Sequence, residues 1–250
     1  MFLVRNLRVI LSLAALGGIV LLISAQRDRE RWRRKELAAC GTKLGLQFDP
    51  SGTEALPRKF KFLTWLQRGD CRYAYNVFRG ESGGLAVTIF DYRFTIITGS
   101  NKGGPAGVDH FWSVYVLELK TDFPNLVIVP QTWESRFREV FGHGHILFES
   151  PEFSRAFQVQ AAEPKFAFDV CHPRMMEYLL SNRDLTVEIG RNAVAICFSD
   201  WLRPERLERN LERLMEIYQL LPGYLLEENG KEAMAGRPGF QSPGGTRRIG

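Results

Sequence analysis

The sequence predicts an α+β protein in which an N-terminal transmembrane helix precedes an antiparallel-sheet domain with a C-terminal amphipathic helix. Three observations support this prediction. Residues 9–25 form an uncharged, mostly apolar run. Residues 72–79 and 85–98 are β-branched and aromatic runs separated by a glycine-containing turn, which indicates a hairpin. Residues 204–221 repeat apolar side chains at helical spacing.

These patterns divide the chain into four parts. We expect a transmembrane anchor at 1–26, a basic juxtamembrane helix at 27–45, an α+β soluble domain at 46–222 and a disordered tail at 223–250. The soluble part has the length of one large domain. The tail is rich in glycine, proline and charge, with few apolar side chains to bury.

The anchor is the strongest prediction from the N-terminal part. With Phe2–Val4 included, the apolar run approaches the roughly 20 residues that cross a bilayer. Arg5 and Arg8 precede it, and a cluster of six basic residues follows it: Arg27, Arg29, Arg31, Arg33, Arg34 and Lys35. The positive-inside rule places the more basic side in the cytoplasm. We therefore expect a single-pass membrane protein with its domain in the cytoplasm.

A cleaved secretory signal peptide is the alternative for the same segment. A basic start, an apolar stretch and the small residue Ala25 also fit a signal peptide, which would give a secreted domain. The basic cluster argues against it, because it would have to cross the membrane directly after cleavage. As a membrane-surface element, the cluster would instead be attracted to anionic lipid head groups.

The composition fits a folded domain without a nucleic-acid partner. Apolar residues make up 45% of the chain, and the net charge of +5 comes largely from the juxtamembrane cluster. The four cysteines are Cys40, Cys71, Cys171 and Cys197, and none is paired in a C-x-x-C motif. Free thiols in a reducing compartment are the simpler interpretation, and two disulfides are the alternative.

The first half of the domain is predicted to be mainly β-structure. In the run 85–98 both alternating sets of side chains are largely apolar, which predicts a central strand covered on each face. A glycine-rich loop is expected at 99–107, followed by strands at 111–120 and 126–129. The loop lacks the G-x-x-x-x-G-K-[ST] pattern of a phosphate-binding P-loop, so we interpret it as a hairpin connection.

The second half mixes helices and strands. Short helices are expected at 132–140 and after Pro173, and extended segments at 146–148 and 157–160. Residues 185–189 and 193–198 are expected to pair across a turn at 190–192. Pro204 begins the terminal helix. Its predicted apolar stripe is Leu207, Leu211, Leu214, Met215, Tyr218 and Leu221, opposite Arg206, Arg209, Arg213 and Glu216.

Several short stretches resemble an uncharacterised family of bacterial single-pass membrane-anchored proteins with a domain of unknown function. These stretches are residues 43–48 (KLGLQF), 76–80 (NVFRG), 90–92 (FDY), and Glu152-Phe153 followed by Phe157. The resemblance implies a membrane location and carries no activity. The hairpins followed by a long terminal helix also resemble pleckstrin-homology-like sheets, an analogy of fold alone.

A metal site is the main chemical candidate. His143, His145 and Glu149 have the spacing H-x-H-x-x-x-E, which on a strand would place three ligand-type side chains near one ion. The pattern resembles the first metal motif of cupins, but Phe137 replaces the expected glycine and no second motif follows. A glycine-containing turn with two exposed histidines is the simpler interpretation.

Two functional hypotheses follow. The first is a non-enzymatic, membrane-tethered binding or scaffold module at the inner face of the membrane, without a cofactor, whose partners are anionic lipids or an unidentified protein. The second is a metal-dependent enzyme that uses the histidine motif. Asp91, within an apolar strand, is expected to have a partner at a sheet edge or to be exposed rather than to act as a catalytic acid.

Overall fold

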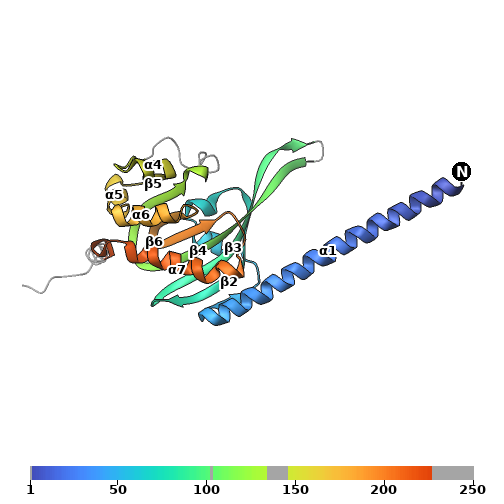
Figure 1. The fold of residues 1–250 in the computed structure, drawn as a ribbon, viewed down its shortest axis with the longest axis horizontal. Helices are drawn as coiled ribbons and strands as arrows, with labels where there is room; N and C mark the ends of the chain where they lie inside the picture. The colour runs from blue at the N-terminus through green and yellow to red at the C-terminus, as the bar shows by residue number, and fades with distance from the viewer. Residues whose placement is uncertain (1, 102–103, 134–145, 227–250) are drawn as a thin grey trace, which may run out of the picture.

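The computed structural model describes residues 2–101, 104–133 and 146–226, without the side chains of residues 2–17, 19–23, 98, 100–101, 104–105 and 133. It confirms an α+β fold built on a six-stranded antiparallel sheet (Figure 1). The strands are β1 (Gln47–Asp49), β2 (Asp70–Ser82), β3 (Leu85–Asn101), β4 (Gly104–Pro130), β5 (Phe157–Ala161) and β6 (Thr186–Phe198). The helices are α1 (Phe2–Leu44), α2 (Ala55–Lys59), α4 (Pro151–Ala156), α5 (Pro164–Val170), α6 (Pro173–Ser181) and α7 (Pro204–Leu220), with 3-10 turns η1 (Thr64–Gln67) and η2 (Gln131–Trp133).

The predicted hairpin at the start of the sheet is confirmed. β2 and β3 pair in antiparallel fashion from Ser82↔Leu85 outward. The turn consists of Gly83 and Gly84, whose φ values of 57° and 77° lie in the left-handed region that two-residue hairpin turns require. A bulge in β2 near Asn76, whose φ is 48°, locally breaks the register.

β4 is the longest strand and forms the centre of the sheet. Its first part pairs with β3 and β6, and its second part pairs with β6 and β5. The strands predicted at 111–120 and 126–129 are therefore one continuous element. The hairpin connection expected at 99–107 is confirmed, but its loop is shorter than predicted, because Gly99 pairs with Ala106 and Asn101 with Gly104. The β3–β4 hairpin extends beyond the body of the domain (Figure 1).

The hairpin predicted across residues 190–192 is also wrong. β6 does not reverse there, and both of its halves pair with β4, from Val187↔Ile128 to Phe198↔Ser113. The glycine-containing segment 190–192 instead accommodates a register shift between the strands, with Arg191 at φ 46°. The turn-like sequence therefore lies opposite an irregularity in which the extra residues belong to β4, and it does not mark a chain reversal.

Each face of the sheet carries its own core, as the two apolar sides of β3 predicted. On one face Phe90, Tyr92 and Phe94 pack with Trp65 and its neighbours in the segment 54–68, which contains α2 and η1. The other face is covered by α4, α5, α6, α7 and the end of α1. For this reason β3 is buried on both of its sides.

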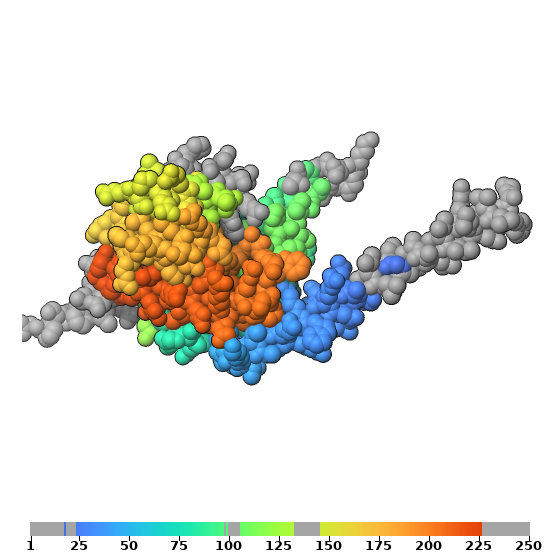
Figure 2. All heavy atoms as spheres, viewed as in Figure 1, coloured from blue at the N-terminus to red at the C-terminus, as the bar shows by residue number. Residues whose placement is uncertain are grey.

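α7 confirms the predicted terminal helix. Leu207, Leu211 and Leu214 are buried against the sheet, together with Ile217. The expected polar side is wrong at one position, because Arg213 is buried as well. Figure 2 shows α7 lying between α6 and the C-terminal end of α1 on one face of the molecule.

α1 is a single helix from Phe2 to Leu44, and its C-terminal part is built into the domain. Leu37 is fully buried, and Gly41 lets the helix approach Phe78 so closely that an added Cβ would lie 3.1 Å from the ring. The juxtamembrane helix predicted at 27–45 is thus the C-terminal part of a longer helix, and the end of this part is docked on the domain. Figure 1 shows the rest of α1 projecting away from the domain.

The predicted transmembrane anchor falls mostly on side chains outside the described set. Over the residues that were described, no helix has a stretch long and apolar enough to cross a membrane. Most of the predicted tail, residues 227–250, likewise lies outside the described ranges. Residues 223–226, which we expected to begin the disordered tail, form a helical turn in which Leu225 is buried in the core.

Candidate functional site

The predicted metal motif is not assembled in the described part of the chain. His143 and His145 lie outside the described residues, and Glu149 is exposed. Among the residues that are described, no group of three or more His, Cys, Asp or Glu side chains could hold an ion. The helix predicted at 132–140 is described through Trp133, where it is a 3-10 turn.

The cysteines do not form a reactive site. All four are unpaired, and Cys171 and Cys197 are buried. Burial raises the pKa of the Cys171 thiol to about 12, so this thiol stays protonated. The neighbouring His172 points elsewhere, with its Nε2 2.9 Å from the Leu220 carbonyl oxygen. Their adjacency in sequence has no chemical consequence.

The basic cluster divides into two groups. Five members are exposed along α1, as a membrane-surface role requires: Arg27, Arg29, Arg31, Arg34 and Lys35. Arg33 departs from the prediction. Its Nη2 lies 3.0 Å from a carboxylate oxygen of Asp91, its Nη1 donates to the Leu202 carbonyl, and its guanidinium stacks over Trp201 at 5.5 Å. Arg33 therefore fastens α1 to the sheet domain.

Asp91 is the buried acceptor at this junction, and its side chain is 1% exposed. It accepts hydrogen bonds from Asn76 Nδ2 at 2.8 Å and from the Leu202 amide at 2.7 Å, in addition to Arg33. Burial raises the pKa of the Asp91 carboxyl, and these three donors offset part of that rise. The bulge in β2 aims Asn76 at the carboxylate. Asp91 is thus a structural partner rather than a catalytic acid.

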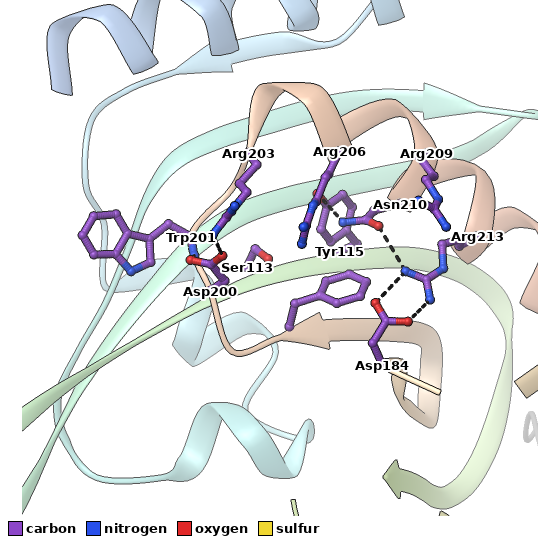
Figure 3. A pocket seen from close by; sticks show the side chains of 11 residues that line it. Ser113, Tyr115, Asp184, Asp200, Trp201, Arg203, Arg206, Arg209, Asn210 and Arg213 are labelled. Atoms are coloured by element: carbon purple, nitrogen blue, oxygen red, sulfur yellow. Dashed lines mark hydrogen bonds and ion pairs between the residues drawn. The ribbon is translucent and has the colours of Figure 1, made fainter. Parts of the chain in front are cut away.

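Next to this junction is a cleft between α7, the middle of β4 and the C-terminal end of β6, with a volume of about 180 Å³ (Figure 3). Four of its lining side chains are arginines. The lining residues are Ser113, Tyr115, Asp184, Phe198, Asp200, Trp201, Arg203, Arg206, Arg209, Asn210 and Arg213. On a helix, residues three and four apart share a side, so Arg206, Arg209, Asn210 and Arg213 all reach the same cleft.

The inner end of the cleft is rigid. Arg213 forms a two-point ion pair with Asp184, and its Nη1 donates to Asn210 at 3.4 Å. Its guanidinium also lies 5.4 Å from the centre of the Phe198 ring. Burial would raise the pKa of the Asp184 carboxyl, but the hydrogen bond and charge of Arg213 hold it below its ordinary value. Asp184 therefore stays ionised and paired.

The outer end of the cleft is more open. Asp200 pairs with Arg203. Trp201 is 45% exposed and lies beside Phe111, with ring centres 5.0 Å apart. Figure 3 shows Arg203, Arg206 and Arg209 projecting from the α7 side toward the cleft.

Two of the arginines carry unmatched charge. Within the described ranges, the guanidinium groups of Arg206 and Arg209 have no hydrogen-bond or ion-pair partner, whereas Arg203 and Arg213 each face an aspartate. Four arginines against two aspartates leave the cleft with two excess positive charges. Such a concave, cationic surface can bind an anion.

Sequence reasoning assigned these arginines to a solvent-facing side and missed the cleft. The signal was present, because Arg203, Arg206, Arg209 and Arg213 repeat at spacings of three and four along one side of α7. What the sequence could not supply was the opposite wall. Asp184 and the end of β6 come from segments distant along the chain, and the continuous course of β6 was not predicted.

The fold and the cleft define an α+β sheet protein with an arginine-lined cleft along its terminal helix. A search of protein-family models finds no match to the chain, and neither does a search of curated proteins. Among solved structures, the chain is similar to the crystal structure of the mycobacterial trehalose monomycolate transport factor A, TtfA. The TM-score is 0.52 at 15% sequence identity, and the match covers 77% of this chain and 97% of the TtfA chain. At this identity the likeness shows the fold alone.

Proposed function

We propose that this protein is a membrane-tethered binding module whose domain is held at the inner face of a bacterial membrane. The observation that carries the proposal is the continuity of α1 from the apolar run at 9–25 into the core of the domain. Arg33 follows Ala25 by eight residues, which is about 12 Å of helix. The domain would therefore stand close to the bilayer, on a stiff connection.

The charges on α1 support this placement. Five exposed basic side chains fill the interval between the apolar run and the docked part of the helix, where anionic head groups would lie. The excess of basic residues after the run favours the cytoplasm for the domain. TtfA is described as a transport factor, and a tethered module without chemistry of its own is compatible with that description.

The cleft supports binding rather than catalysis. Its two carboxylates are engaged in ion pairs with Arg203 and Arg213, so they are poorly placed to exchange protons with a substrate. The remaining unpaired groups are cations that can hold a ligand in place. Binding is thus the role that this surface supports best.

Reporter fusions test the proposed placement. A fluorescent protein that matures in the cytoplasm, fused after Gly250, should be active, and alkaline phosphatase at the same position should be inactive. The full chain should remain in the membrane pellet after an alkaline carbonate wash. Active phosphatase, or release of the chain by carbonate, would contradict the proposal.

A charge variant tests what sets the orientation. Replacing the five exposed basic residues listed above with glutamine leaves Arg33 after the apolar run, against Arg5 and Arg8 before it. Part of the population should then invert, with phosphatase activity as the readout. The matched control replaces five exposed basic residues elsewhere in the domain, and its orientation should not change.

A further inference from the structure

We propose that the cleft between α7, the middle of β4 and the C-terminal end of β6 binds a phosphate group through Arg206 and Arg209. The phosphate would belong to a lipid head group or to a free phosphorylated molecule. This inference deepens the proposed function by naming the ligand chemistry. Only the lipid source rests on the proposed function. The cleft is part of the folded domain, so binding of a free phosphorylated molecule does not depend on where the domain is located.

Charge balance identifies the ligand as an anion. Two of the four arginines are neutralised by ion pairs, Arg203 by Asp200 and Arg213 by Asp184. The guanidinium groups of Arg206 and Arg209 then face the cleft with no partner in the described part of the chain. A phosphate monoester carries about 1.5 to 2 negative charges at neutral pH and would match both, and a phosphodiester carries one and would match half of this charge.

Geometry favours phosphate over a carboxylate. Arg206 and Arg209 are one helical turn apart, so their Cβ atoms lie about 5–6 Å from each other. Guanidinium groups bind phosphate oxygens through paired N–H donors, and two arginines at this separation can hold different oxygens of one tetrahedral group. A carboxylate holds its two oxygens in one plane, where a single guanidinium fork binds both, so it does not present separate oxygens to two arginines as a tetrahedral phosphate does.

The walls restrict the size of the ligand. The volume of about 180 Å³ lies below the roughly 300–1,000 Å³ of pockets that enclose drug-sized molecules. A phosphate with a small polar substituent fits this space, whereas a nucleotide does not. The inner wall is fixed by Tyr115, whose hydroxyl accepts a hydrogen bond from Asn210 at 3.4 Å, so the cleft is preformed.

The position of the cleft makes a lipid head group a natural source. Trp201, at the outer rim of the cleft, stacks with Arg33 of α1. The carbonyl of the next residue, Leu202, accepts a hydrogen bond from Arg33, and its amide donates one to Asp91. The rim is therefore attached to the part of α1 that would leave the domain for the membrane. In the tethered protein, phosphates of the inner leaflet would lie near this opening.

Calorimetric titration of the full-length protein in non-ionic detergent tests the proposal. The probes are inorganic phosphate, glycerol 3-phosphate and the water-soluble diester glycerophosphoglycerol, with glycerol as the uncharged control. We expect binding of at least one phosphate probe and none of glycerol. Arg206→Gln and Arg209→Gln should each weaken it about tenfold or more, which corresponds to the loss of one charge-assisted hydrogen bond of about 1.5–3 kcal/mol.

Arg174→Gln is the matched control, because Arg174 is an exposed arginine on α6 outside the cleft. It should leave the affinity unchanged. Thermal melting of every variant checks that the fold is retained, which we expect because Arg206 and Arg209 are exposed. If Arg206→Gln and Arg209→Gln bind as tightly as the parent, or if no phosphate probe binds, the inference is overturned.

The probes also separate the two sources. Tighter binding of glycerophosphoglycerol than of inorganic phosphate supports a lipid head group, and the reverse order supports a free phosphate. The measurement in detergent does not depend on how the chain lies in a membrane. If the reporter experiment contradicts the membrane tether, the phosphate-binding result therefore still stands. If no phosphate probe binds, the proposed tether still stands.

Discussion

Replacing Arg33 with methionine should destabilise the domain by removing the counter-charge of a buried carboxylate. The side chains of Arg33 and Asp91 are 18% and 1% exposed, so the ion pair is largely shielded from water. Removing one partner of a buried pair costs about 3–5 kcal/mol. Asp91 keeps its hydrogen bonds from Asn76 and the Leu202 amide, which places the expected loss near the lower end, about 3 kcal/mol.

The loss should depend on pH in a defined direction. Burial already raises the pKa of Asp91, and removing Arg33 raises it further. A carboxyl with a raised pKa in the folded state supports stability at low pH, and that contribution is lost as the pH rises through the folded-state pKa. The destabilisation by Arg33→Met should therefore be larger at pH 8 than at pH 5.

The assay is urea unfolding of the full chain in non-ionic detergent at both pH values. Arg34→Met is the matched control, because Arg34 is exposed and lies 4.0 Å from Glu30 in a surface pair of less than about 1 kcal/mol. Asp91→Asn combined with Arg33→Met should recover part of the loss, since no charge is then buried. A loss equal at both pH values, or no loss at all, would refute the reasoning.

Other predictions concern the core and the termini. Glu188 is fully buried on β6, and burial raises the pKa of its carboxyl to about 7. Between pH 4.5 and 7 the parent should lose about 3 kcal/mol of unfolding free energy relative to Glu188→Gln, measured by urea titration. Leu211→Ala should cost about 2–4 kcal/mol at every protein concentration, because Leu211 is buried within the monomer; a parent-like melt would contradict this packing. Truncation after Leu226 should leave the melting temperature unchanged, whereas truncation after Pro222 should lower it, because it removes Leu225 from the core.

Local sequence patterns predicted the elements whose signals are contained within one segment. The β2–β3 hairpin followed from its paired glycines, and α7 followed from an apolar stripe that begins at Pro204. The two-sided burial of β3 was equally visible, because both sets of alternating side chains are apolar. In each case the physical cause lies within about 20 residues of chain.

The features that were not predicted depend on partners far apart in sequence. Arg33 looked like one of six equivalent basic residues until its partner Asp91 was known. Arg213 appeared to belong to a solvated face, although Asp184 pairs with it at the side of α7. The glycine-containing segment 190–192 has the composition of a turn, but β6 runs through it and pairs with β4 both before and after it. Local composition could not distinguish a continuous strand with irregular pairing from a chain reversal.

The central position of β4 has a consequence for the order in which the protein can fold during synthesis. Val114 and its neighbours pair with β3 on one side, which emerges first, but on the other side with Cys197 and the rest of β6. Until β6 has left the ribosome, one edge of this apolar strand has no partner, and unpaired strand edges promote aggregation. The non-local pairing also implies slow sheet formation. On the proposed tether, the N-terminal helix would hold the nascent chain at the membrane during this interval, which would limit free diffusion of the incomplete sheet.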